Sequence, residues 1–326
     1  MPRKKWPQVL AATLLAALLS GCGHLLAVDT RNPPRAYAPS RAGESLAARF
    51  QPVFLVQNER PENSIGRVKA EREPGGGERL YVDPKDPAVY FEETSFSGAR
   101  GRYTNLVYRV HFPNTPYSLV PFILTAGKNV GIMVIVTLNE KSRPVLVTTV
   151  HTCGCYAAVV PTTELPRDCL PEGFREGPIR VYGERLPGML DFSGKGSPRV
   201  LVVLRPGVHR VMDLKVIDGE APEAARRIDA PLVPAGELWR VPFPGGGTTS
   251  FFHEGGLLRG HVKGSVKPWE TILMSWMALD LFVGADKAFD TARTKNPFYT
   301  SLKPWNRHAS DLWDFPAFLA FHGFRL

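Results

Sequence analysis

One segment near the middle of the chain constrains the fold more than any other. Within residues 129–139, one face of an extended chain carries an aliphatic side chain at every second position, and Met133 and Ile135 lie on the opposite face. A strand that is apolar on both faces is typical of the middle of a sheet that is covered on both sides. Residues 139–144 then form a polar stretch and Val145 begins a second apolar segment, so the sequence predicts a β-hairpin.

Composition and a second hairpin pattern also favour β structure. Glycine and proline each number 30, about 9% of the chain, against averages of roughly 7% and 5%. Both residues interrupt helices and serve turns. The apolar segments 200–204 and 208–217 flank the turn-forming residues 205–207, which again indicates a hairpin.

Helical spacing of apolar residues appears only after Trp239. Residues 268–283 and 310–321 carry their large apolar side chains at helical intervals, with Pro268 suited to a first turn and Gly284 to a stop. We therefore expect a mainly β, α+β fold. It would be an antiparallel sheet or sandwich-like β domain covered by one or two C-terminal helices.

The N-terminus has the layout of an export signal. Residues 1–5 are basic, residues 9–19 are apolar and uncharged, and Leu19-Ser20-Gly21-Cys22 follows. The apolar run is too short to span a bilayer, which needs ~20 apolar residues, and the whole arrangement is typical of a secretory signal peptide. The last four residues resemble the lipobox of bacterial lipoprotein precursors.

This resemblance implies cleavage before Cys22 and acylation of that cysteine with a diacylglycerol and a third chain such as palmitate. Each buried methylene contributes roughly 0.8 kcal/mol, so several chains hold a protein on a membrane where one holds it weakly. Gly23 stands where an Asp commonly signals retention at the inner membrane. In a Gram-negative cell the resemblance therefore implies a lipid anchor in the outer membrane, with the protein facing the periplasm.

The remaining chain suggests a simple organisation. Residues 1–21 are expected to be the signal peptide, and residues 22–45 hold little apolar material and are expected to be a flexible tether. Residues 46–326 are expected to form a single β-rich domain whose helical part begins at about residue 265.

Charge argues against one class of partner. The full chain carries 40 basic and 31 acidic residues, and three of the basic residues leave with the signal peptide, so the mature formal charge is near +6. The basic residues are spread along the chain, whereas nucleic-acid binding needs a clustered basic face. The sequence therefore excludes nucleic acid and leaves an envelope protein or a polysaccharide open as the partner.

The candidate site is a cluster of cysteine and histidine residues. His151, Cys153 and Cys155 would project to one face if the strand that begins at Val145 continued through them. Cys169 follows fourteen residues after Cys155, beyond a proline-containing loop, at a distance that suits a return to the cluster.

Three chemical interpretations of the cluster stay open beside a structural one, in which the cysteines and the histidine are buried core residues. The first is a disulfide, favoured by export to an oxidising compartment. A bridge from Cys153 or Cys155 to Cys169 is easier than one between Cys153 and Cys155, which needs a kink at Gly154. The second is a zinc site, because three cysteines and one histidine suit tetrahedral zinc, although Cys-x-Cys is a weaker signal than Cys-x-x-Cys. The third is a thiol nucleophile with His151 as its base. No Cys-x-x-Cys-His, His-Glu-x-x-His or Gly-x-Ser-x-Gly motif is present.

Two hypotheses for function follow, of which the sequence favours the first. The first is an envelope-anchored lipoprotein with a non-catalytic binding or scaffolding role. The second is an exported metal- or thiol-dependent enzyme, a hydrolase, centred on His151, Cys153 and Cys155. The lack of a known catalytic signature supports the first hypothesis, and the cysteine-histidine cluster supports the second.

Overall fold

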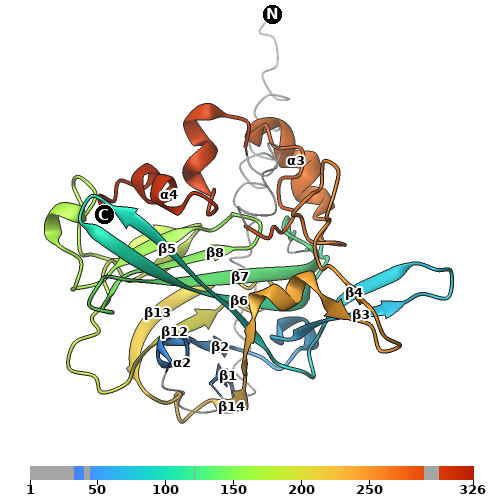
Figure 1. Ribbon diagram of the computed structural model, residues 1–326, viewed down its shortest axis with the longest axis horizontal. Helices are drawn as coiled ribbons and strands as arrows, with labels where there is room; N and C mark the ends of the chain where they lie inside the picture. The colour runs from blue at the N-terminus through green and yellow to red at the C-terminus, as the bar shows by residue number, and fades with distance from the viewer. Residues whose placement is uncertain (1–32, 40–44, 121, 290–300) are drawn as a thin grey trace, which may run out of the picture.

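The computed structural model describes residues 33–39, 45–120, 122–289 and 301–326 (Figure 1). The expected signal peptide and the lipidation site Cys22 lie outside these residues. Two β-sheets form the body of the protein, and the C-terminal helices lie on one side of it (Figure 1). The expected mainly β fold with C-terminal helices is confirmed.

The larger sheet has six strands in the order β15-β5-β6-β7-β8-β9. All neighbours in it pair antiparallel except β15 and β5, which pair parallel. Its strands are β5 (Val89–Gly98), β6 (Gly101–Thr115), β7 (Gly127–Leu138), β8 (Pro144–His151), β9 (Ala158–Pro161) and β15 (Leu232–Pro234). Strand β7 lies inside the sheet with nearly every side chain buried, as its two apolar faces predict, and it forms the predicted hairpin with β8.

The smaller sheet has five strands in the order β13-β12-β2-β1-β14. They are β1 (Arg35–Ala38), β2 (Val53–Val56), β12 (Pro198–Leu204), β13 (Val211–Asp218) and β14 (Arg226–Asp229). The predicted hairpin around residues 205–207 is confirmed by β12 and β13. Strand β1 is fully buried although it falls within the segment 22–45 expected to be a tether, so the folded body begins before residue 46.

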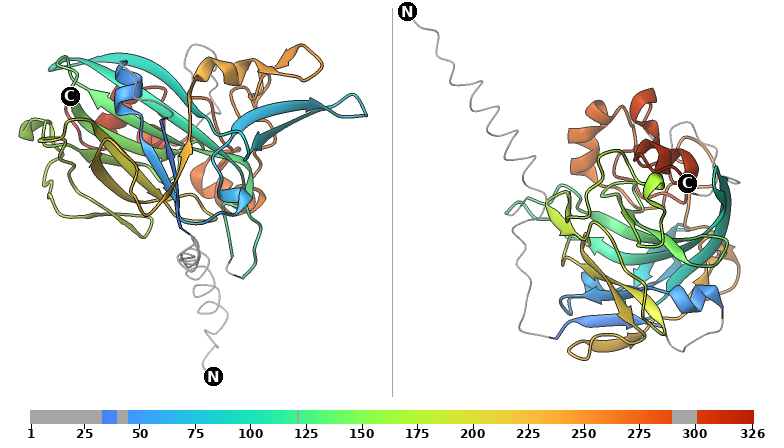
Figure 2. Two further views of the ribbon diagram at one scale, coloured as in Figure 1. Left: turned by 90° about the horizontal axis from the view of Figure 1, so that it is seen from below. Right: turned by 90° about the vertical axis from the view of Figure 1, so that its left-hand side faces the viewer.

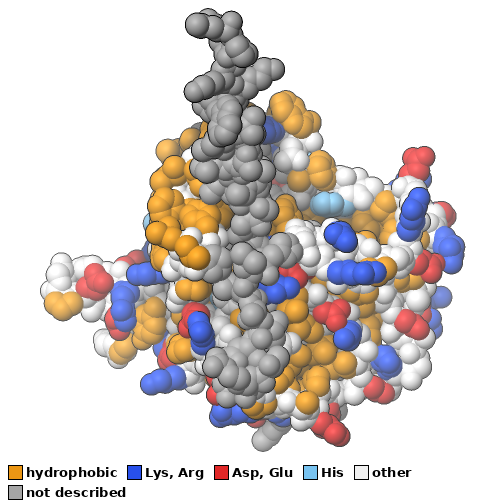
Figure 3. Space-filling view, turned by 180° about the vertical axis from the view of Figure 1, so that it is seen from behind, with side chains coloured by type: hydrophobic (Ala, Val, Ile, Leu, Met, Phe, Trp, Pro, Cys, Tyr) orange, Lys and Arg blue, Asp and Glu red, His pale blue; other side chains and the backbone are white. Residues whose placement is uncertain are grey.

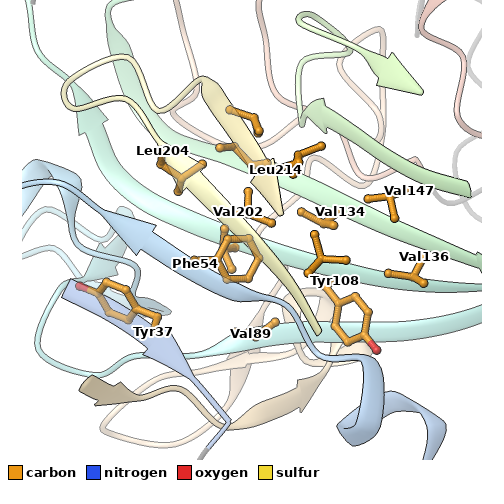
Figure 4. Close-up of a cluster of buried hydrophobic side chains, with 14 of the residues drawn as sticks. Tyr37, Phe54, Val89, Tyr108, Val134, Val136, Val147, Val202, Leu204 and Leu214 are labelled. Atoms are coloured by element: carbon orange, nitrogen blue, oxygen red, sulfur yellow. The ribbon is translucent and has the colours of Figure 1, made fainter. Parts of the chain in front are cut away.

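The main hydrophobic core lies between the two sheets. Phe54 and Val202 of the smaller sheet point toward Tyr108 and Val134 of the larger one (Figure 4). Each of these four side chains is fully or almost fully buried. The two sheets therefore form a sandwich, and β7 has one face in its core.

The second face of the larger sheet is covered by the C-terminal part of the chain. Helix α4 (Phe315–Phe321) packs Phe315, Phe318 and Leu319 against Met133 and Ile135 of β7 in a second apolar cluster. Figure 2 shows the C-terminal helices on the side of the larger sheet that faces away from the smaller sheet. One apolar face of β7 thus packs into the core between the two sheets, and the other packs into the apolar cluster under α4.

Short hairpins and helices complete the fold. The left view of Figure 2 shows the β3–β4 hairpin extending beyond the sandwich. The remaining elements are β3 (Arg67–Arg72), β4 (Glu78–Asp83), β10 (Ile179–Val181), β11 (Glu184–Leu186), β16 (Val241–Pro242), β17 (Thr248–Thr249), α2 (Leu46–Phe50), η1 (Pro61–Asn63), η2 (Arg167–Cys169), η3 (Ala235–Trp239) and η4 (Pro304–Ala309).

Both C-terminal helices are shorter than the apolar spacing predicts. Helix α3 (Pro268–Ala278) begins at the predicted proline but ends at Leu279, which takes the left-handed conformation with φ 48°, instead of continuing toward Gly284. Helix α4 begins at Phe315, where the Asp314 side chain accepts a hydrogen bond from the Ala317 backbone N–H. Within the described part of the chain, no helix is long and apolar enough to cross a membrane.

An apolar surface surrounds α3. Six large apolar side chains on and beside this helix are more than a third exposed: Val266, Trp269, Ile272, Trp276, Leu279 and Leu281. Seen from behind in Figure 3, hydrophobic side chains gather in the upper part of the molecule, where Figure 1 places α3. We call these six residues the α3 apolar surface.

Candidate functional site

The chain turns immediately after β8, and this turn builds the candidate site. The backbone N–H of Gly154 donates to the carbonyl of His151 at 2.7 Å, and the N–H of His151 donates to the carbonyl of Cys155 at 2.9 Å. Gly154 has φ 87°, which favours glycine. Strand β8 ends at His151, so the condition under which His151, Cys153 and Cys155 would share one strand face is not met.

The turn brings the thiols of Cys153 and Cys155 together. The two thiols influence each other's pKa, and neither is in a disulfide. The Cys155 thiol and the nearby Lys267 ammonium lower the pKa of Cys153, against the opposing effect of burial. The neighbouring Cys153, burial and Glu270 raise the pKa of Cys155 well above its usual value. The two thiols therefore differ strongly in acidity, with Cys153 favoured as the thiolate.

A buried ion pair lies beside the thiols. Lys267 Nζ is 3.3 Å from Asp286 Oδ2, and both side chains are essentially inaccessible to solvent. The Asp286 carboxylate also accepts hydrogen bonds from the hydroxyls of Thr152 and Ser265. Burial opposes the charge of Lys267, but Asp286 and Cys153 outweigh it and raise the pKa of the lysine. Lys267 therefore carries a fixed positive charge next to the thiols.

Gly131 on β7 allows the turn to pack this closely. The Thr152 backbone N–H donates to the Gly131 carbonyl at 2.9 Å. A Cβ atom at position 131 would lie 2.8 Å from His111 Nδ1 and 2.9 Å from Thr152 Oγ1. Only glycine leaves room for the Thr152 hydroxyl that bonds Asp286.

Helix α3 contributes a buried carboxyl group to the site. Glu270, in the first turn of the helix, accepts a hydrogen bond at Oε1 from Cys155 Sγ at 3.5 Å. Burial raises the pKa of Glu270, and the Lys267 ammonium partly offsets this effect. A Cβ atom at Gly284 would lie only 2.6 Å from Oε2 of the same carboxyl group, so this glycine makes space for it.

A second buried lysine, Lys287, also binds the turn. The Lys287 backbone N–H donates to the Thr152 carbonyl at 2.7 Å, and its Nζ donates to the Cys153 carbonyl at 3.4 Å. The same Nζ lies 3.6 Å from Asp280 Oδ2. The backbone of the turn is therefore held by a side chain that itself has a buried counter-charge.

An aromatic and cationic layer packs on His151. The His151 ring lies edge-on to Tyr156 with centroids 4.7 Å apart, and the Arg210 guanidinium lies 5.4 Å from the centroid of the same tyrosine ring. Arg210 is also 3.2 Å from Glu184 Oε1. Burial lowers the pKa of His151 well below its usual value, and Lys267 and Arg210 lower it further. The imidazole is therefore neutral.

The structure separates the four predicted site residues. No hydrogen bond joins the His151 side chain to either cysteine within the described residues, and its Nε2 has no hydrogen-bond partner there. Cys169 lies in the apolar cluster under α4, where its carbonyl accepts from the Arg325 N–H. The pair Cys153–Cys155 is thus the centre of the site, and Cys169 belongs to a different part of the molecule.

Sequence reasoning missed the charged residues around the thiols. Lys267, Glu270, Asp280, Asp286 and Lys287 follow the cysteines by more than a hundred residues. The signal that could have found them is the presence of Glu270 and Asp280 inside an otherwise apolar stretch, since a buried charge needs a partner.

Comparison with known proteins found no match to this chain. No protein-family model matches the chain. No curated protein and no solved structure matches it either. Across residues 33–39, 45–120, 122–289 and 301–326, no group of three or more His, Cys, Asp and Glu side chains is placed to hold a metal ion.

The arrangement suits thiol chemistry. Thiol–disulfide exchange needs one thiol that is stable as a thiolate, a second thiol within bonding reach, and access for a partner. Cys153 is 4% exposed and Cys155 is partly exposed. Cys155 is therefore the more exposed residue of the two, and Lys267 stabilises negative charge on Cys153.

Proposed function

We propose that the protein is an envelope lipoprotein, anchored through acylated Cys22, whose folded body exchanges a disulfide between Cys153 and Cys155 with thiols of other proteins. The observation that carries this proposal is the tight turn that holds Cys153 and Cys155 so near each other that each thiol shifts the pKa of the other. The anchor rests on the resemblance of residues 19–22 to a lipobox. Together they imply a thiol redox protein held at a membrane surface in an oxidising compartment.

The exchange has two steps when the Cys153–Cys155 pair starts as a disulfide and the substrate is a dithiol. A substrate thiolate attacks Cys155 Sγ, the bond to Cys153 breaks, and Cys153 leaves with the electron pair as a thiolate. The second substrate thiolate then attacks the substrate sulfur of the mixed disulfide. Cys155 leaves and takes up a proton. The substrate dithiol is oxidised to a disulfide, and the cysteine pair is reduced.

The environments of the two sulfurs support attack at Cys155 and departure of Cys153. A leaving thiol departs faster when its pKa is lower, and the pKa of Cys153 is lowered by Cys155 and by Lys267. Cys155 is the more exposed residue of the two, and we assign the first attack to its sulfur on that basis. The reaction is reversible, so a protein or small-molecule disulfide restores the oxidised pair.

The geometry favours exchange over the hydrolase hypothesis. A cysteine hydrolase needs an imidazole that takes the proton from the thiol. The His151 ring instead packs on Tyr156 and lies among the cationic groups Lys267 and Arg210. The second thiol, Cys155, has no role in that mechanism but is required for exchange.

Equilibration in glutathione redox buffers tests the proposal. The full-length protein, purified in detergent, is incubated at a series of ratios of reduced to oxidised glutathione, quenched with acid, alkylated and mapped by mass spectrometry. We expect a Cys153–Cys155 disulfide whose fraction follows the buffer reversibly. Cys153→Ser and Cys155→Ser abolish it, and Cys169→Ser, the matched control, leaves it unchanged. A pair that stays reduced at every ratio, or a bridge that involves Cys169, overturns the proposal.

Transfer to a substrate is measured separately. The oxidised protein is mixed with a reduced dithiol peptide, and appearance of the peptide disulfide is followed by chromatography. We expect transfer from the wild-type protein and none from Cys153→Ser. Equal rates from the two proteins would contradict a redox function.

The anchor has its own test. Mass spectrometry of the protein from its native host should find the chain beginning at Cys22 with glyceride and acyl groups on that residue. An unmodified Cys22, or a chain that retains residues 1–21, would contradict the lipoprotein proposal while leaving the thiol site untouched.

A binding role is the second candidate, and one observation favours it. The α3 apolar surface exposes Ile272 and Trp276 by about two thirds each, and contiguous exposed apolar side chains often mark interaction sites. This surface is carried by the helix that also holds Glu270. A protein with no exchange activity but with this surface would fit a scaffold at the envelope.

A further inference from the structure

The geometry points to Glu270 as the group that gives a proton to Cys155 when this sulfur is released and takes it back in the reverse reaction. This inference rests on the proposed exchange at Cys153 and Cys155. Its basis is a direct contact, because Cys155 Sγ donates to Glu270 Oε1 at 3.5 Å. Glu270 therefore touches the sulfur atom whose bond breaks in the second step.

The carboxyl group is held in place by its surroundings. Glu270 follows Pro268 in the first turn of α3, and Thr271 Oγ1 ties this turn to the Val283 carbonyl at 3.2 Å. The next residue on that segment, Gly284, lies against the carboxyl group with no side chain in between. The carboxyl group is thus positioned from two elements, and its distance to Cys155 is fixed by packing.

The state of the carboxyl group suits a proton donor. Glu270 is almost completely buried, and its Oε2 has no hydrogen-bond partner among the described residues. A carboxylate with so few donors around it is poorly stabilised, so burial favours the neutral acid and raises the pKa of Glu270. A carboxylic acid with a raised pKa can protonate a leaving thiolate near neutral pH.

The other charged groups that face Glu270 are less suited to donate a proton to Cys155. Lys267 and Lys287 lower the pKa of its carboxyl group, whereas Asp286 raises it. Lys267 pairs with Asp286, and Lys287 pairs with Asp280, so each of these ammonium groups already has a carboxylate partner. Within the described chain, no other acidic side chain forms a hydrogen bond with Cys155.

Substitution of Glu270 separates this inference from the proposed function. The rate of disulfide transfer to the reduced dithiol peptide is measured against pH for the wild-type protein and for Glu270→Gln. We expect the variant to form the Cys153–Cys155 disulfide in glutathione buffers but to transfer it ~100-fold more slowly, the low end for general acid–base catalysis. The limb of the wild-type pH profile that reports Glu270 disappears. Glu254→Gln, on an exposed loop, is the matched control and keeps the wild-type profile.

The outcomes are distinguishable. A wild-type protein that does not exchange at all contradicts the proposed function. A wild-type protein that exchanges, with a Glu270→Gln variant of the same rate and pH profile, overturns the role of Glu270 alone. If Glu270→Gln does not fold, Glu270→Asp decides, because it keeps an acid on a shorter side chain. It should be slower than wild type and keep, in its pH profile, the limb that reports an acid at position 270. A profile without that limb overturns the inference.

Discussion

Lys267 Nζ lies 3.3 Å from Asp286 Oδ2, and the two side chains are 2% and 0% exposed. Asp286 also accepts from the hydroxyls of Thr152 and Ser265, so its carboxylate is well supplied with donors. Removing one partner of a buried ion pair leaves an uncompensated charge, and this costs more than the pair itself contributes. The stability of this region therefore depends on both residues together.

Lys267→Met should lower the free energy of unfolding by about 3–5 kcal/mol, because it leaves Asp286 buried without its cation. The double variant Lys267→Met/Asp286→Asn should be more stable than the single one, since no charge remains to be compensated. Urea denaturation followed by circular dichroism measures both. Lys215→Met is the control, because Lys215 pairs with Asp213 on the surface and exposed pairs contribute only about 0–1 kcal/mol. Equal losses for the two single variants would contradict the argument.

Lys267 should also set the acidity of Cys153, the leaving thiol of the first exchange step. Its ammonium is one of the groups that lower the pKa of Cys153. Lys267→Gln should therefore raise the pKa of Cys153 and reduce its thiolate fraction at neutral pH. The thiolate absorbance of Cys153 against pH, measured in a Cys155→Ser/Cys169→Ser background, gives the value with and without the lysine. An unchanged titration curve would show that the cation has no influence on this sulfur.

Gly131→Ala should destabilise the protein by about 1–3 kcal/mol, the usual cost of overpacking. The added Cβ would lie within 2.9 Å of the His111 ring and the Thr152 hydroxyl, and both groups are buried. Gly236→Ala is the matched control, because a Cβ atom at that position meets nothing within 4 Å. Thermal unfolding of the two variants makes the comparison. A Gly131→Ala protein as stable as Gly236→Ala would mean that the turn can move away from β7.

The sheet-forming parts of the fold were predictable from local pattern. The two apolar faces of residues 129–139 predict an interior strand, and β7 has this position. The polar residues 139–144 and 205–207 predict hairpins, and both are present. Alternation of apolar and polar residues indicates which side chains of a strand are buried, and a short polar loop indicates that the two strands it joins are neighbours. Both features can therefore be predicted from a single sequence.

Other features depend on contacts that no local pattern records. Strand β1 is only four residues long, and it is held by β2 on one side and β14 on the other. Helix α3 ends at Leu279, whose left-handed conformation leucine rarely adopts. Glycine adopts this conformation readily, so the sequence predicted that the helix would end at Gly284. Tertiary packing determined both.

Only part of the candidate site was predictable, because some of its residues are close in sequence and others come together only by tertiary packing. The short spacing of Cys153 and Cys155 identified the two thiols, because residues so close in sequence lie close in space. Lys267 and Glu270 reach them only through the folding of the C-terminal region onto β7 and β8. Cys169 has a suitable sequence distance but packs under α4 instead.

Buried histidines should make the protein sensitive to acid. Burial lowers the pKa of His111 and of His209 to about 3, whereas an unfolded histidine titrates near 6.5. Between these values the unfolded state binds protons that the native state does not, so stability is lost as the pH falls from about 6.5 toward 3. Asp311 acts in the opposite sense, because burial raises its pKa to about 6. Its contribution is present at low pH and is lost as the pH rises from its ordinary value of 3.8 through 6.

His209→Asn isolates one histidine. Asparagine tolerates the φ of 55° at this position, and the substitution removes the titrating ring that stacks on Phe112. The free energy of unfolding should then change less steeply between pH 4 and 6, by up to about 1.4 kcal/mol per pH unit. Urea denaturation across this range gives the slopes, and Ser142→Asn, placed at a φ of 54° with no titrating group lost, is the control. A slope that is the same in wild type and His209→Asn would mean that His209 becomes protonated in the folded protein.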